Sequence, residues 1–270
     1  MIYTMWKPCG MTSNDFATHA KIQLQCKRLC FAGRLDPLAQ GVMMLLTDDD
    51  VSEMNVHLLH NKVYEFKLII GISTESLDLA GKITNICPPS AEHTAEYFKE
   101  TFHRFIETYD TQRYPLVSSF VVKLGAVRKP LWWFAKHNIP VEVPIKQVRI
   151  HEYDIGVIES VPIDKFIECS LSRLDTVVNE KTRYDLQTDV LKNQYVSVLD
   201  NIRYNLHPNN PNYPNNPNLV CISIKLDVTT GFYVRQFCED FGKHIGYPCI
   251  AFDITRTAIY PNQFIPQSSM

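Results

Sequence analysis

Alternation of hydrophobic and polar positions marks the clearest element of the chain. Between residues 219 and 228 every second residue is apolar, namely Val220, Ile222, Ile224, Leu226 and Val228. Because neighbouring side chains of a strand point to opposite faces, this period predicts a strand with one buried face. The nearly unbroken apolar run 42–47 predicts a strand buried on both faces. Further strands are predicted over residues 1–8, 63–71, 118–124, 146–158 and 249–258.

Helical spacing of apolar residues predicts the elements between these strands, over residues 13–27, 52–60, 90–107, 129–138 and 233–244. Thr12 or Ser13 can cap the first helix. The third carries a stripe expected to face the core, made of Tyr97, Phe98, Thr101, Phe102 and Phe105. The pattern predicts an α/β fold of the α+β kind, with a mixed, mostly antiparallel sheet and flanking helices.

The segment 159–218 differs from its surroundings and predicts an insertion into a domain formed by residues 1–158 and 219–270. Its charged residues are mixed in sign, which is typical of a solvated face. It ends in the Asn- and Pro-rich stretch His207–Asn218. Proline has no backbone donor, so this stretch cannot form a regular ladder, and we expect it to be a flexible tail.

Composition adds that the chain is an ordinary globular protein. Of its 270 residues 45% are hydrophobic and 21% charged, and the formal net charge is −2. A slightly acidic chain argues mildly against a polyanionic ligand, since phosphate contacts usually require a basic surplus. Residues 1–47, however, carry Lys7, Lys21, Lys27, Arg28 and Arg34 against only Asp15 and Asp36. A basic face is therefore compatible with the overall charge.

Cysteine usage and the N-terminal sequence indicate an intracellular protein. The eight cysteines include no Cys-x-x-Cys pair, which argues against both a disulfide framework and a zinc site. Residues 1–8 lack the pattern of a signal peptide, and the apolar block 41–46 is too short to cross a bilayer. We expect a soluble protein, most readily in the cytoplasm, with a nuclear or organellar location still open.

Asp36 is the first candidate for chemistry. It precedes Pro37, which disfavours helical backbone at the aspartate and so stiffens a loop bounded by Gly33 and Gly41. From these residues alone, a plain Asp-Pro turn is slightly favoured over a catalytic carboxylate.

Five motifs in order change this balance. They are the loop Gly33-Arg34-Leu35-Asp36-Pro37-Leu38-Ala39, the earlier Lys7-Pro8-x-Gly10-Met11-Thr12-Ser13, the segment Lys62-Val63-Tyr64-Glu65 with 71–81 after it, the helix 129–136, and Thr230-Gly231-Phe232-Tyr233-Val234-Arg235 with 240–242. Together they resemble the TruB family of tRNA pseudouridine synthases over roughly two thirds of the chain. The resemblance implies a pseudouridine synthase fold, with residues of about 108–145 forming the thumb that grips RNA.

The same resemblance implies an activity and a site. Such enzymes detach a uracil from its ribose, rotate it and rejoin it through carbon, at the uridine of position 55 in the tRNA T loop. Asp36 is implied as the catalytic carboxylate, either as a nucleophile at the ribose or as a base, and Arg235 as the cation that orients it and keeps it charged. The implied substrate-binding residues are Tyr64 as stacking platform, Tyr233, Phe31, Arg34, Lys7, Ile254 and Arg256.

Two departures from the family pattern leave the substrate more open than the chemistry. Phe31 stands where the family usually has a histidine that wedges the RNA loop. The chain also leaves no room for the C-terminal RNA-binding PUA domain of many relatives. The segment 159–218 either replaces that domain or decorates an edge of the fold, and we favour decoration.

The remaining expectations concern cofactors, partners and a rival function. No metal or cofactor is expected, and His57 and His60 lack a third ligand nearby. The expected partner is RNA, with tRNA as the particular RNA. We expect no membrane association, no obligate protein partner and a monomeric state. The alternative is a catalytically weak protein that binds or folds RNA on the same scaffold.

Overall fold

A central sheet organises the computed structural model, which describes residues 1–177, 188–205 and 218–261. Its strand order is β1-β3-β13-β4-β12-β11, with β2 paired to β3. All pairs are antiparallel except the short parallel contact of β13 with β3, so the predicted mixed, mostly antiparallel sheet is confirmed. Its strands are β1 (Ile2–Lys7), β2 (Leu29–Ala32), β3 (Gln40–Thr47), β4 (Asn61–Ile70), β11 (Ile150–Pro162), β12 (Asn218–Val228) and β13 (Cys249–Tyr260).

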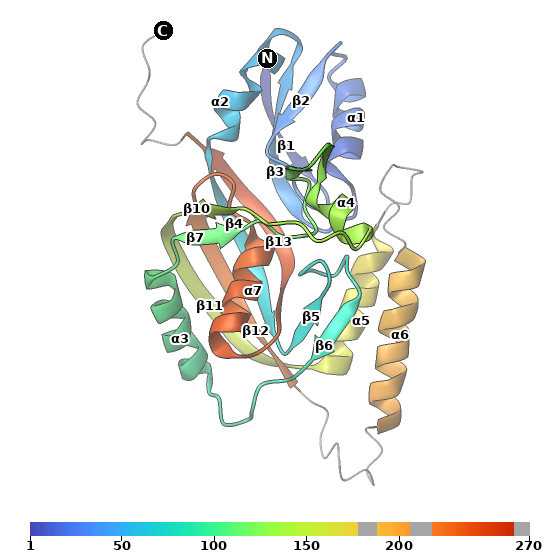
Figure 1. Cartoon of the computed structure of the whole chain (residues 1–270), viewed down its shortest axis with the longest axis vertical. Helices are drawn as coiled ribbons and strands as arrows, with labels where there is room; N and C mark the ends of the chain where they lie inside the picture. The colour runs from blue at the N-terminus through green and yellow to red at the C-terminus, as the bar shows by residue number, and fades with distance from the viewer. Residues whose placement is uncertain (178–187, 206–217, 262–270) are drawn as a thin grey trace.

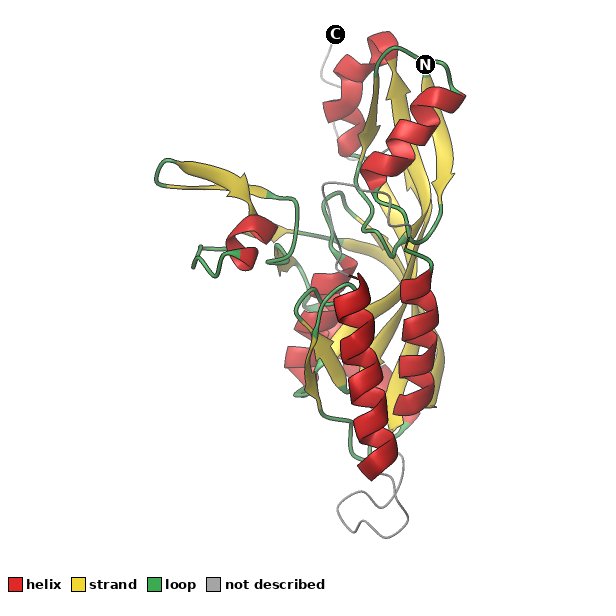
Figure 2. Ribbon diagram, turned by 90° about the vertical axis from the view of Figure 1, so that its right-hand side faces the viewer, coloured by secondary structure: helices red, strands yellow, loops and turns green. Residues whose placement is uncertain are grey.

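Three two-stranded pairs lie outside this sheet. They are β5 (Ile72–Thr74) with β6 (Ile83–Ile86), β7 (Thr111–Arg113) with β10 (Ile145–Gln147), and β8 (Val121–Leu124) with β9 (Val127–Pro130). The β8–β9 hairpin and a short helix stand away from the main body in Figure 2. Both lie within the predicted thumb-like segment 108–145.

Helices cover both faces of the sheet (Figure 1). They are α1 (Ser13–Gln23), the 3-10 turn η1 (Asp48–Glu53), α2 (Met54–Leu58), α3 (Ala95–Glu107), α4 (Leu131–Lys136), α5 (Ile163–Asp175), α6 (Thr188–Asn205) and α7 (Val234–Ile245). One core packs α1, α3 and α7 against strand residues such as Leu68 and Ile222, and a second packs α5 and α6 against Ile69 and Cys221. Adjacent residues of one strand thus serve opposite cores, as the period of two requires.

The aromatic stripe of α3 faces the first core, as predicted. Phe98, Phe102 and Phe105 are buried, and Phe102 and Phe105 contact Phe237 and Phe241 of α7 edge-on or at a tilt. Contacts of this geometry add to the burial of apolar surface. They fix α7, the helix that carries Arg235, against the sheet.

Several predicted boundaries differ from the structure. The first helix, predicted to about residue 27, ends at Gln23 because Gln25 takes a left-handed backbone with φ of 50°. The strand β2 then pairs with β3, although no strand was predicted there. The strand at 42–47 begins at Gln40 and alternates in burial before its last three residues become fully buried, so burial on both faces holds only for its end. The strand predicted over 146–158 is divided into β10 and β11.

The segment predicted as an insertion contributes to the second core. Its first residues end β11, and Ile163, Phe166 and Ile167 of α5 are almost completely buried. The α5–α6 pair therefore covers a face of the sheet, whereas decoration of an edge was expected. Residues 178–187 and the Asn- and Pro-rich stretch 206–217 lie outside the described residues, and the domain boundaries stay predictions.

Candidate active site

The loop that carries Asp36 is held by the N-terminal motif. Gly10 N donates a hydrogen bond to Pro37 O at 2.9 Å. Ser13 Oγ donates to Leu35 O at 2.7 Å and accepts from Leu35 N at 2.9 Å. These contacts link two motifs that stand about 25 residues apart in the sequence and place Asp36 at a defined point above β3.

Lys7 is part of this support and does not line the pocket. Its side chain is fully buried, and its ammonium donates to Pro8 O at 2.9 Å, Pro37 O at 3.3 Å and Ala39 O at 2.6 Å. Burial lowers the pKa of Lys7 to about 8. A lysine predicted to bind substrate thus has its charge directed to carbonyl groups of residues 33–41, which form the candidate catalytic loop.

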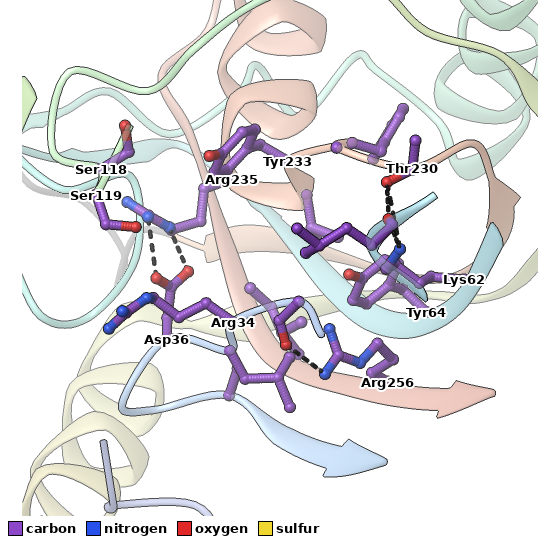
Figure 3. A pocket seen from close by; sticks show the side chains of 18 of the residues that line it. Arg34, Asp36, Lys62, Tyr64, Ser118, Ser119, Thr230, Tyr233, Arg235 and Arg256 are labelled. Carbon is purple, nitrogen blue, oxygen red and sulfur yellow. Dashed lines mark hydrogen bonds and ion pairs between the residues drawn. The ribbon is translucent and has the colours of Figure 1, made fainter. Parts of the chain in front are cut away.

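Asp36 and Arg235 form the bidentate pair predicted from the sequence, although 199 residues separate them (Figure 3). Arg235 Nε lies 2.8 Å from Asp36 Oδ2, and Arg235 Nη2 lies 3.1 Å from Asp36 Oδ1. The arginine side chain is 5% exposed and that of the aspartate 36%. The buried arginine therefore orients the carboxylate, while part of the aspartate side chain remains accessible from the pocket.

The remaining donors of Arg235 are occupied as well. Nη1 donates to Ser76 O at 2.6 Å, and both terminal nitrogens donate to Val117 O at 3.1 Å. A second carboxylate, on Asp78, lies 3.7 Å from Arg235 Nε. Burial raises the pKa of Asp78, which accepts hydrogen bonds from Ser76 Oγ and from Ala80 N. The arginine is thus held by a shell of acceptors, and Asp78 is a functional candidate that the sequence reasoning did not assign.

A pocket of about 280 Å³ opens beside Asp36. Of the predicted site residues it brings together Arg34, Asp36, Tyr64, Tyr233, Arg235, Ile254 and Arg256. Tyr64 comes from β4 and Tyr233 from the residue that precedes α7, so aromatic rings from two distant segments contribute to its wall (Figure 3). Burial, and then the charge of Asp36, raise the pKa of Tyr233 to about 12.

Arg256 lines the pocket but acts on the backbone. It is fully buried, with Nε donating to Val42 O at 2.7 Å and Nη2 to Gly33 O at 3.1 Å. It therefore fixes Gly33, whose φ of 90° favours glycine, at the start of the catalytic loop. Lys62, which was not predicted as a site residue, lies nearby with its pKa lowered to about 8 by burial.

Phe31 is not among the pocket residues. It lies half-buried on β2, and the guanidinium of Arg34 stands over its ring, 5.3 Å from the centroid. A cation held over an aromatic face in this way is attracted to it. The contact holds Arg34, which does line the pocket, at the pocket's edge.

Other pocket residues were missed by sequence reasoning. Thr230 is one of them, and it belongs to a motif singled out above but was given no role. Others are small polar side chains without a distinctive pattern, among them Ser118 and Ser119. Ser118 Oγ is buried and has no hydrogen-bond partner within the described part of the chain. Nothing in the local sequence distinguishes these hydroxyls from ordinary surface residues.

A buried lysine next to the pocket provides a pH-dependent prediction. The ammonium of Lys146 lies 4.5 Å and 4.3 Å from the ring centroids of Tyr114 and Tyr233, without a hydrogen-bond partner among the described residues. Burial lowers its pKa from 10.5 to about 7. Between these values the unfolded chain binds more protons than the folded one, so stability rises with pH.

We therefore expect Lys146→Met to be more stable than the wild type at pH 6, with a difference that shrinks as the pH rises from 7 towards 10. Urea unfolding midpoints at four pH values measure this. Lys123→Met, at an exposed position of the β8–β9 hairpin, is the control. A difference that stays constant across the range would contradict the assignment.

The described residues form neither a metal-binding cluster nor a membrane-spanning helix. Within the described residues there is no group of three or more His, Cys, Asp or Glu side chains that could hold a metal ion. His57 and His60 contact each other edge-on, with ring centroids 5.0 Å apart. None of the helices in the described ranges is both long and apolar enough to cross a membrane.

The chain matches a known protein family over more than half of its length. A model of the N-terminal domain of TruB family pseudouridylate synthases matches residues 21–172, which is more than half of the chain. The chain belongs to the TruB family. The predicted family is confirmed.

Individual relatives of this TruB family member are bacterial proteins named tRNA pseudouridine synthase B. That of Malacoplasma penetrans is 28% identical over 172 residues, covering 64% of this chain and 72% of the relative. That of Oceanobacillus iheyensis is 26% identical over 256 residues, covering 95% and 64%. That of Leptospira interrogans serovar Lai is 31% identical over 156 residues, covering 56% and 48%. The chain thus spans less than two thirds of the length of the last two relatives.

Among solved structures, a Cbf5-Nop10-Gar1 complex aligns with a TM-score of 0.49 at 12% identity, covering 96% of this chain and 48% of that chain.

Proposed function

We propose that this TruB family member isomerises a uridine to pseudouridine in RNA, with tRNA as its substrate and the T-loop uridine at position 55 as its target. The observation that carries the proposal is the bidentate Asp36–Arg235 pair beside a pocket with aromatic walls. A half-exposed carboxylate oriented by a buried arginine is suited to act on a sugar carbon.

The size of the pocket supports a single extruded nucleoside as ligand. Its volume of about 280 Å³ lies just below the range of small-ligand sites, which span about 300–1,000 Å³. Taking a base out of its stack costs a few kcal/mol, and stacking on an aromatic ring recovers about 1–3 kcal/mol. Tyr64 is the ring best placed for this, because it lines the pocket from a central strand.

The proposed reaction breaks one bond to the ribose and makes another. The bond between uracil N1 and ribose C1′ breaks, the base turns, and a bond forms between C5 and C1′. The proton on C5 is lost and N1 gains one, so the product is an isomer of the substrate. Asp36 takes part as an ionised carboxylate, either as nucleophile at C1′ or as base towards a ribose proton.

Charge on the projecting β8–β9 hairpin supports RNA as the carrier of the uridine. The exposed side of the β8–β9 hairpin carries Lys123, Arg128 and Lys129, within a chain whose net charge is −2. Basic residues on a projecting hairpin are suited to contact phosphates. The names of the relatives support tRNA as the particular RNA. A monomeric state and a cytoplasmic location stay predictions.

Mapping pseudouridine in a tRNA transcript after incubation with the purified protein tests the proposal. We expect conversion at position 55 and at no other uridine. Binding of the tRNA without conversion would favour the alternative, a protein that binds or folds RNA. Conversion at a different position would overturn the assigned target but leave the chemistry intact.

A further inference from the structure

One arginine of the α5–α6 layer connects two walls of the active site. Arg173, in the last turn of α5, donates from Nη2 to Leu38 O at 3.1 Å. Its Nη1 lies 2.8 Å from Asp253 Oδ1, and its side chain is 18% exposed. The first contact is on the catalytic loop and the second on β13, so a single guanidinium joins segments more than 200 residues apart in the sequence.

Both contact points stand next to residues that line the pocket. Leu38 follows Asp36 and Pro37, and the proline ring restricts the backbone between them. Asp253 directly precedes Ile254, a pocket residue. The backbone of Asp253 is left-handed, with φ of 54°, where the register of β13 against β4 shifts. A non-glycine residue holds this conformation only when its surroundings enforce it.

The end of α5 is itself anchored against the N-terminal motif. A Cβ at Gly10 would lie 2.0 Å from Thr176 O, so only glycine permits this approach of the helix end. Gly10 N in turn donates to Pro37 O. The ring of Phe252 contacts Phe166 of α5 at 5.5 Å and lies under the Arg173 guanidinium at 5.4 Å. The end of α5 that carries Arg173 is therefore fixed against both the N-terminal motif and β13.

We propose that Arg173 is a positioning residue for the reaction, which fixes the Asp36 loop relative to the pocket wall at Ile254 by bridging Leu38 O and the Asp253 carboxylate. The inference rests on the proposed function. Arg173 lies just beyond residues 21–172, the part of the chain that matches the family model.

The test compares Arg173→Met, Arg173→Lys and Asp253→Asn with the wild-type chain in single-turnover conversion of tRNA. We expect Arg173→Met to slow conversion by about 10- to 100-fold with the tRNA Kd changed less than about twofold, because a misplacement of about 1 Å can cost that much in rate. Arg173→Lys, which keeps the charge but cannot bridge both oxygens, is expected to lose less. Asp253→Asn is expected to be slowed as well, and the double variant Arg173→Met with Asp253→Asn no more than Arg173→Met alone.

Lys192→Met is the matched control, since Lys192 Nζ pairs with Asp175 at 2.6 Å within the α5–α6 layer but contacts neither wall of the site. Its rate is expected to equal that of the wild type. Urea unfolding at the assay temperature shows whether each variant is folded. If Arg173→Met fails to fold, Asp253→Asn and Arg173→Lys carry the test.

If the wild type is active and Arg173→Met converts uridine at the same rate, this inference is overturned and the proposed function stands. The same holds if Arg173→Met does not fold and both Asp253→Asn and Arg173→Lys convert at the wild-type rate. An equal loss in Lys192→Met would also overturn it, because the effect would then belong to the layer as a whole. A wild type that converts no uridine would overturn both.

Discussion

Asp36→Asn is expected to abolish uridine conversion, with a loss of rate of at least about 10³-fold, while tRNA affinity changes little. Asparagine keeps the shape of the side chain and can still face Arg235, but it offers no charged oxygen to the ribose. Both roles considered for Asp36, nucleophile and base, depend on that oxygen. Single-turnover conversion and a binding titration at one fixed salt concentration measure the two quantities.

Asp154→Asn, at an exposed position on β11, is the control for this substitution. It should convert uridine at the wild-type rate. Turnover by Asp36→Asn within tenfold of the wild type would remove Asp36 from the chemistry. A parallel loss of RNA affinity and folding would show that the residue is needed for structure and not for the reaction.

Arg235→Met is expected to impair both activity and stability. The guanidinium contacts the Asp36 carboxylate, lies 3.7 Å from that of Asp78, and donates to two backbone carbonyls. Its removal leaves Asp36 without orientation, for which we expect a loss of about 10²- to 10³-fold in rate. It also leaves Asp78 buried without a counter-charge, a change that typically costs about 3–5 kcal/mol.

The stability loss of Arg235→Met should depend on pH in a defined direction. Burial already raises the pKa of Asp78, and loss of the neighbouring cation raises it further. An acid whose pKa is raised by folding does not destabilise the folded chain while it is protonated in both states. The penalty grows as the pH rises from the unfolded pKa towards the folded pKa, and it is complete above the folded pKa. The variant should therefore lose less unfolding free energy at pH 5 than at pH 8.

Arg235→Lys and Arg104→Met complete this experiment. Lysine keeps the charge but lacks the planar fork, so we expect an intermediate rate. Arg104 is exposed on α3, and its substitution should leave both rate and stability unchanged. A stability loss in Arg235→Met that is equal at pH 5 and pH 8 would show that Asp78 does not depend on Arg235 for its charge.

Elements with a strong local pattern could be predicted from the sequence. The alternating residues of β12 and the aromatic stripe of α3 agree with the structure because each depends on one burial direction along one element. Boundaries set by turn geometry were less accurate. The left-handed Gln25 ended α1 early, and β2 was missed because a four-residue strand carries too little pattern.

The candidate site divides in the same way. The sequence by itself determined which segments are proposed to carry the chemistry, since Asp36 before Pro37 and Arg235 two residues after Tyr233 are recognisable within short motifs. The tertiary structure alone decided what surrounds them. Lys7, expected to bind substrate, turns to the carbonyls of the catalytic loop, and Asp78 joins Arg235.

The physical reason is that such roles depend on partners that local sequence does not specify. The sequence shows that a lysine or arginine carries a charge, but it does not show which groups the side chain contacts. Lys7 became structural because Pro37 and Ala39 present carbonyl oxygens to it in a buried place, and Arg173 became a bridge because the catalytic loop and β13 pass beside the end of α5. The chemistry that a residue type can perform could be proposed from the sequence. The direction in which each side chain points depended on contacts that form only in the folded chain.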